Sequence, residues 1–188
     1  MILFLSLNAQ PDVKTGSIFK SLFIAECGIG YSQNLSIKGY DDNVSGGGLN
    51  GTFRLRWETN KKFGFGFEAG YLALAAQSED NAMTKSGITD YDMNMYAIPL
   101  ILFFNLEHNN IQFSAGTGIY KVYSEIDALG ETSSSSLSDM GYIVSLGYNY
   151  PIYTDYGINT HLKWNYISDI KTSVISGMVY FYYRFPEM

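Results

Sequence analysis

Residues 49–59 read LNGTFRLRWET, and small or apolar side chains alternate along them with polar ones. Leu49, Phe53 and Leu55 fall on one face, whereas Arg54 and Arg56 fall on the other. Residues two apart point to the same side of a β-strand but to different sides of a helix. The period of two therefore predicts a strand with one apolar and one polar face.

The same period recurs along the chain, for example in FGFGFEAGYLALAA at residues 63–76. It divides the chain into eight predicted strands: residues 21–33, 49–59, 63–77, 93–106, 111–125, 140–152, 158–168 and 173–185. Each is long enough to cross a bilayer as a tilted strand, which takes about 9–11 residues.

The predicted connections alternate between short and long. Short turns are expected at residues 60–62, 107–110 and 153–157, and long polar loops at residues 34–48, 78–92 and 126–139. Short turns at one end and long loops at the other are typical of an outer-membrane barrel. The sequence thus predicts an all-β fold, an eight-stranded antiparallel up-and-down transmembrane β-barrel, as one domain over residues 10–188.

The composition excludes some classes of protein. The net charge is −6 and no basic cluster occurs, which argues against a nucleic-acid partner. No apolar run approaches the roughly 18 residues that a membrane helix needs. Residues 1–9, MILFLSLNA, are interpreted as the remainder of a secretory signal peptide; the alternative is an apolar first strand.

The polar face carries few charges, too few for a surface in water. Small residues mixed with a few charges suit the narrow lumen of an eight-stranded barrel, where buried charges need partners. We expect Glu26, Arg54 and Glu68, near the middle of adjacent strands, to meet there. The predicted network of lumen ion pairs comprises Glu26, Arg54, Arg56, Glu58, Glu68, Lys163 and Arg184.

The apolar face is rich in aromatic residues near the strand ends, as expected at the two membrane surfaces. The predicted interface aromatics include Tyr31, Trp57, Tyr71, Tyr148, Trp164, Tyr183 and Phe185. Lys121 shares this face and is expected to reach the interface, and Cys27 is expected to be a small apolar filler on it. Alternation alone also fits a soluble lipocalin-like carrier, in which the apolar face would point inward.

Pro99 falls inside a predicted strand, where its nitrogen cannot donate a hydrogen bond to the ladder. A closed barrel has no edge strand on which to place it. We therefore expect a β-bulge at this position.

The last strand ends in GMVYFYYRF, residues 177–185. With the strand number and the alternation of the loops, this ending resembles the small eight-stranded outer-membrane β-barrels of Gram-negative bacteria, the class of the outer membrane protein A transmembrane domain and outer membrane protein X. The resemblance covers nearly the whole chain after Gln10. It implies that Gly177, Tyr180, Tyr183 and Phe185 form a signal for the barrel assembly machinery.

Signs of catalysis are few. The two histidines are His108, in a predicted turn, and His161, on the lumen face. No zinc spacing, P-loop or dinucleotide motif appears, so no metal or cofactor is expected.

Three hypotheses remain. The first is a structural barrel, or one that binds an extracellular ligand through loops 34–48, 78–92 and 126–139, with outer-membrane lipid as its surroundings and no wide pore. The second is a lipid-modifying barrel enzyme or a conduit for hydrophobic ligands. The third is the soluble carrier.

Overall fold

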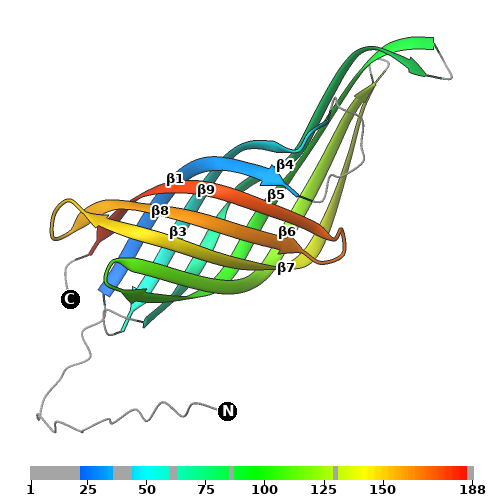
Figure 1. The fold of residues 1–188 in the computed structure, drawn as a ribbon. Helices are drawn as coiled ribbons and strands as arrows, with labels where there is room; N and C mark the ends of the chain where they lie inside the picture. The colour runs from blue at the N-terminus through cyan, green and yellow to red at the C-terminus, as the bar shows by residue number, and fades with distance from the viewer. Residues whose placement is uncertain (1–21, 36–43, 60–62, 85–86, 129–130, 186–188) are drawn as a thin grey trace, which may run out of the picture.

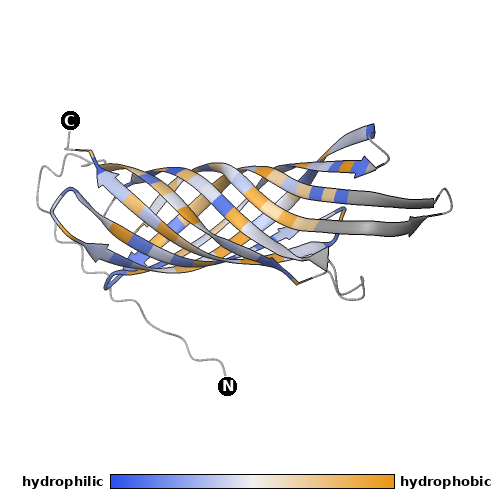
Figure 2. Ribbon diagram, turned by 90° about the horizontal axis from the view of Figure 1, so that it is seen from above, coloured by the Kyte–Doolittle hydropathy of each residue, from blue (hydrophilic) through white to orange (hydrophobic). Residues whose placement is uncertain are grey.

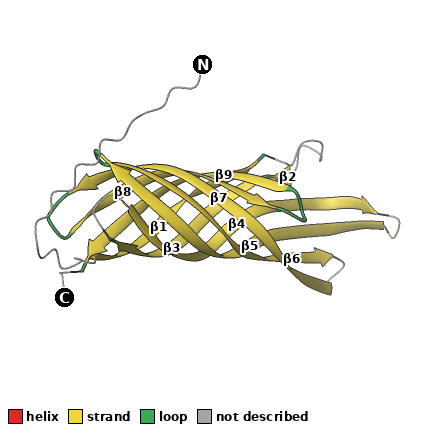
Figure 3. Cartoon of the chain, turned by 90° about the horizontal axis from the view of Figure 1, so that it is seen from below, coloured by secondary structure: helices red, strands yellow, loops and turns green. Residues whose placement is uncertain are grey.

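The computed structural model describes residues 22–35, 44–59, 63–84, 87–128 and 131–185. Within these ranges the chain forms strands and no helix (Figure 3). The strands are β1 (Leu22–Asn34), β2 (Val44–Ser45), β3 (Gly47–Glu58), β4 (Phe63–Thr84), β5 (Gly87–His108), β6 (Ile111–Ala128), β7 (Glu131–Pro151), β8 (Tyr156–Ile167) and β9 (Thr172–Arg184). The described residues contain no helix long and apolar enough to span a membrane.

The eight long strands close into an antiparallel barrel (Figure 1). Each long strand pairs with the long strand that follows it in the chain, and β1 pairs with β9 to complete the ring. The two-residue β2 is added at Ala76 and Gln77 of β4. The predicted all-β, eight-stranded, up-and-down barrel is confirmed.

Two of the predicted long loops are instead mainly strand. Residues 78–84 of β4 pair with the start of β5, and residues 126–128 of β6 pair with the start of β7. These two hairpins project beyond the rest of the barrel at one end (Figure 1). Their polar composition suggests loops because the alternation that marks a strand is absent from these stretches of sequence.

The other connections are shorter. The turn between β5 and β6 consists of Asn109 and Asn110, with φ angles of 49° and 67°. Asparagine tolerates this left-handed backbone, and a two-residue hairpin needs it. Residues 60–62, most of the predicted loop 34–48 and the predicted signal peptide at residues 1–9 lie outside the described residues.

The expectation of a bulge at Pro99 is wrong. The β4–β5 ladder passes from Ala69↔Leu100 to Leu72↔Ala97 without a change of register. On the other side Pro99 stays paired with Tyr120. The strand therefore accommodates the missing N–H by skipping contacts with β4, and the register shift falls further along, between Ala73 and Ala75.

The barrel carries its buried charged residues inside and is apolar outside. Along β7 and β8 buried and exposed residues alternate strictly within the barrel, and Figure 2 shows the matching alternation of hydrophobic and hydrophilic residues along the strands. Leu100, Phe67 and Leu162 are more than half exposed, whereas Glu26, Arg54 and Arg56 are buried. A soluble carrier would have the opposite arrangement, so the lipocalin-like alternative is contradicted.

Candidate functional site: the charged lumen and the projecting hairpins

Arg54 lies at the centre of the lumen between two carboxylates. It is the direct cross-strand neighbour of Glu26 on β1 and of Glu68 on β4. Its guanidinium approaches each carboxylate to 3.3 Å, and all three side chains are buried. The antiparallel register thus brings together the three residues that the sequence placed near the middle of adjacent strands.

The ion pairs continue in both directions from this centre. Arg56 lies 3.1 Å from Glu26 and 3.4 Å from Glu58. At the other end, Lys163 of β8 pairs with Glu68 across the lumen. Charges in a medium of low dielectric are costly unless paired, so this alternating chain of cations and anions is what makes a charged lumen tolerable.

Neutral side chains complete the network, and no sequence motif marks them. Asn159 donates to Glu26 at 3.0 Å. Arg54 donates to Ser114 at 3.2 Å and stacks over the ring of Phe103, with its guanidinium carbon 4.1 Å from the ring centroid. All face inward by alternation, which is the one signal that could have identified them.

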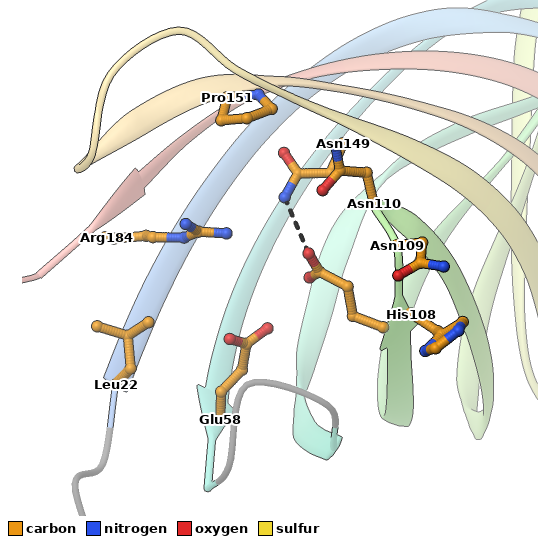
Figure 4. A pocket seen from close by; sticks show the side chains of 9 residues that line it. Leu22, Glu58, His108, Asn109, Asn110, Asn149, Pro151 and Arg184 are labelled. Atoms are coloured by element: carbon orange, nitrogen blue, oxygen red, sulfur yellow. Dashed lines mark hydrogen bonds between the residues drawn. The ribbon is translucent and has the colours of Figure 1, made fainter.

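The lumen opens into a pocket of about 460 Å³ at the end with the short turns (Figure 4). Glu58 and Arg184 line it, and Glu107 accepts a hydrogen bond of 3.2 Å from Asn149 there. Arg184 forms no ion pair within 4.0 Å among the described residues, so it stands apart from the chain of charges. Glu107, expected in a turn, lies 4.0 Å from Arg56 and extends the network.

Toward the projecting hairpins the lumen is filled by apolar side chains. This cluster of buried residues comprises Leu72, Leu74, Ala97, Ile101, Phe103, Tyr120, Val122, Ile143, Ile167 and Val174. Below it, the enclosed space beside Glu68 and Lys163 has a volume of about 10 Å³, which is room for about one water molecule. No wide pore runs through the described barrel.

The two histidines lie in different parts of the barrel. His161 is buried against Tyr180, with ring centroids 5.2 Å apart, and neither of its nitrogens has a hydrogen-bond partner among the described residues. His108 lines the open pocket at the end of β5. The described residues contain no group of three or more potential metal ligands.

A tyrosine of the last strand packs over a glycine of the first. The ring of Tyr180 occupies the space where Gly28 would carry a Cβ atom. The two residues are direct partners in the β1–β9 ladder, which closes the barrel. This contact gives the predicted assembly-signal residue Tyr180 an inward position, while Gly177, Tyr183 and Phe185 face outward.

Replacing Gly28 with valine should destabilise the barrel by about 1–3 kcal/mol, because the added side chain must displace the ring of Tyr180. The unfolding midpoint in urea, followed by tryptophan fluorescence in detergent, measures the effect. Gly51→Val is the matched control, since a Cβ atom at Gly51 meets nothing within 4 Å. Equal midpoints for the two variants would contradict the proposed packing.

Asp139 organises the turn between β8 and β9, a role that the sequence did not indicate because Asp139 was placed in the loop 126–139. Its carboxylate is buried and accepts hydrogen bonds from the backbone N–H of Asp169 at 2.7 Å and of Ile170 at 3.3 Å. Lys171, at the end of this turn, has a φ of 49°. The carboxylate thus satisfies N–H groups that the turn leaves without a strand partner.

Asp139→Ala should lower stability by about 1–3 kcal/mol, because two N–H groups lose their acceptor. Amide hydrogen exchange should accelerate at Asp169 and Ile170. Asp139→Asn keeps an acceptor oxygen and should show much less of either change. Unchanged exchange in Asp139→Ala would show that the carboxylate does not hold the turn.

All seven predicted interface aromatics have outward positions on the strands. Phe23 and Phe65 flank Trp57 near the short turns, with centroids 6.3 and 4.6 Å from it. Trp164 stacks on Tyr166 nearer the other end of β8. Tyr31, Tyr71, Tyr148, Trp164, Tyr183 and Phe185 are each at least 40% exposed. Cys27 is also exposed on this outer face.

The projecting part of β7 has one unpaired edge. Residues 131–138 are all exposed, and among the described residues they pair with β6 alone. Pairing of β7 with β8 begins at Gly141. No other strand of the described part of the chain pairs with the second edge of this segment.

Comparison with known proteins gives likeness at the level of the fold. No family model and no curated protein matches the chain. Among solved structures, Neisserial surface protein A is 13% identical with a TM-score of 0.53, covering 88% of this chain and 97% of its own. The attachment invasion locus protein Ail of Yersinia pestis, solved with the heparin analogue sucrose octasulfate, is 16% identical with a TM-score of 0.54, covering 87% and 99%. A major outer membrane protein from Thermus thermophilus is 10% identical with a TM-score of 0.57, covering 88% and 99%.

The apolar exterior of the barrel indicates its surroundings. Exposed Leu, Ile and Phe side chains surround the barrel, and a surface of this kind needs lipid rather than water as its solvent. The chain thus has the fold of the small eight-stranded outer-membrane β-barrels, with an exterior suited to lipid.

Proposed function

We propose that this protein stands in the outer membrane of a Gram-negative bacterium and binds an extracellular partner through its projecting hairpins. The observation that best supports this proposal is the unpaired edge of β7 at residues 131–138. An exposed strand edge is a template for pairing with an extended segment of another protein. The short turns then face the periplasm, as in other barrels of this type.

The lumen supports a binding role over transport or catalysis. It is filled by the ion-pair chain and, toward the hairpins, by apolar side chains. A conduit for hydrophobic ligands would need an open apolar path, and the described lumen has a charged middle. His161, the candidate for lipid-modifying chemistry, is buried in the lumen against Tyr180.

Assembly and anchoring complete the proposal. Gly177, Tyr180, Tyr183 and Phe185 are proposed to be recognised by the barrel assembly machinery before β9 pairs with β1. Outer-membrane lipid is proposed to cover the apolar exterior. Nucleic acid is not among the proposed partners.

Shortening the β6–β7 hairpin should abolish partner binding without affecting the barrel. Ser124 and Ser135 are directly opposed, so a two-residue Asn-Gly turn can join them and remove the segment between. Cells carrying the full-length protein should retain proteins from a defined panel of labelled plasma and matrix proteins, whereas cells carrying the shortened variant should not.

A second variant separates backbone pairing from side-chain recognition. Scrambling the order of residues 131–138 keeps the edge and should keep binding, because strand pairing uses main-chain groups. Unboiled samples of both variants should keep the gel mobility of a folded barrel. Equal retention by full-length and shortened proteins would overturn the proposal.

A further inference from the structure

Three tyrosines stand side by side on the outer surface of the barrel. Tyr71 of β4 and Tyr96 of β5 have ring centroids 5.2 Å apart, and Tyr96 and Tyr123 of β6 have centroids 5.1 Å apart with planes 15° from parallel. Tyr96 and Tyr123 are also direct cross-strand partners. Stacking of this kind fixes the rings in a row with their hydroxyl groups at neighbouring positions.

Charged groups stand on both sides of Tyr123. Lys121 is exposed, and its ammonium lies 5.1 Å from the centroid of the Tyr123 ring. It forms no salt bridge within 4.0 Å among the described residues. Glu125, two residues further out on the same strand, accepts a hydrogen bond of 3.4 Å from the Tyr96 hydroxyl. The row thus combines an unpaired cation with hydroxyl groups and one carboxylate.

The row lies where the hydrocarbon of a bilayer ends. Tyr96 comes twelve residues before His108, the last residue of β5, and Tyr123 comes twelve residues after Ile111, the first residue of β6. A tilted strand crosses the hydrocarbon core in about 9–11 residues. Below the row, Ile98 and Ile119 continue the lipid-facing surface on the same strands. A lipid whose chains cover the residues beneath would therefore place its headgroup against the row.

We propose that Tyr71, Tyr96, Tyr123 and Lys121 form a binding site for the phosphorylated sugar headgroup of an outer-leaflet glycolipid. Lys121 pairs with a phosphate in a charge-assisted interaction, which is roughly twice as strong as a neutral hydrogen bond. The tyrosine hydroxyls and the Glu125 carboxylate bond to sugar hydroxyls. The inference rests on the outer-membrane orientation proposed above.

The test uses the full chain reconstituted in phosphatidylcholine nanodiscs with or without lipopolysaccharide. Native mass spectrometry should detect lipopolysaccharide retained by the protein. Lys121→Ala should weaken retention about tenfold, and Tyr96→Phe about threefold, as expected for loss of a charged and of a neutral hydrogen bond. Tyr148→Phe, in the exposed Tyr148–Tyr150 pair near the opposite end, is the matched control and should retain lipid as the unmodified protein does.

Removal of phosphates from the lipopolysaccharide identifies the group that Lys121 recognises. With the dephosphorylated lipid, the difference between Lys121→Ala and the unmodified protein should disappear. Equal retention of the intact lipid by these two proteins would overturn the site. Full competition by millimolar glucose 1-phosphate would overturn the choice of a membrane glycolipid, since a soluble sugar phosphate would then suffice.

The result is separable from the proposed orientation. Insertion is checked first, by the mobility of unboiled protein on gels. Failure to insert as a folded barrel would contradict the outer-membrane function, whereas correct insertion without retained lipopolysaccharide would contradict the glycolipid site alone.

Discussion

Arg54→Ala should be the most destabilising single change in the lumen, at about 3–5 kcal/mol. It removes the cation that lies 3.3 Å from both Glu26 and Glu68, and leaves two buried carboxylates with fewer partners. Repulsion between anions in a medium of low dielectric adds to the lost attraction. The effect is measured as the shift of the urea midpoint, multiplied by the slope of the unfolding curve.

Arg184→Ala serves as the control for Arg54. The residue type is the same, but Arg184 lies at the open pocket and takes part in no ion pair within 4.0 Å among the described residues. Its loss should cost only about 1 kcal/mol, because it removes a contact with the ring of Tyr182, 5.2 Å from the guanidinium carbon, and no ion pair. If the two variants unfold at the same urea concentration, the charges at the centre are hydrated and the network is not the core of the barrel.

Leu102→Arg should destabilise the protein in lipid by about 2–4 kcal/mol. Leu102 is exposed on the outer face of β5, six residues from the end of the strand at His108, and so lies near the middle of the bilayer. A charge there must leave water or deform the membrane. Reversible unfolding from phospholipid vesicles measures this loss.

Leu106→Arg tests whether depth in the membrane is the cause of this loss of stability. Leu106 lies on the same strand and the same face, two residues from His108, and is exposed to a similar extent. An arginine there reaches the interface, and the cost should fall to about 0–1 kcal/mol. A cost at Leu106 equal to that at Leu102 would contradict the position of the membrane along the strands.

The fold could be predicted because the bilayer and the lumen impose the same alternation on every strand. The meeting of Glu26, Arg54 and Glu68 followed from that alternation and from antiparallel pairing of neighbours, without any further motif. In the projecting hairpins the sequence does not alternate, so it predicts loops where the structure has strands.

The other lumen contacts could not be predicted, because they depend on the register between strands, which a single sequence specifies poorly. The sequence predicts a turn that includes Glu107, but the β5–β6 connection is shorter than expected, so Glu107 belongs to β5. Asn159 is a neutral residue on the inner face, and its sequence neighbours do not distinguish it from other polar lumen residues. Only the position of Glu26 across the barrel reveals its role. At Pro99 the missing N–H predicted a distortion, but the ladder could lose contacts on one side and keep its register.

The pairing of β1 with β9 has a consequence for how the molecule forms. It joins Ile24 to Arg184, so the ring is closed by residues from opposite ends of the described chain. Such non-local contacts make folding slow, and until β9 is in place both β1 and β8 present open edges that can aggregate. The ring therefore cannot close before β9 has been synthesised, and the two open edges are exposed to aggregation until then.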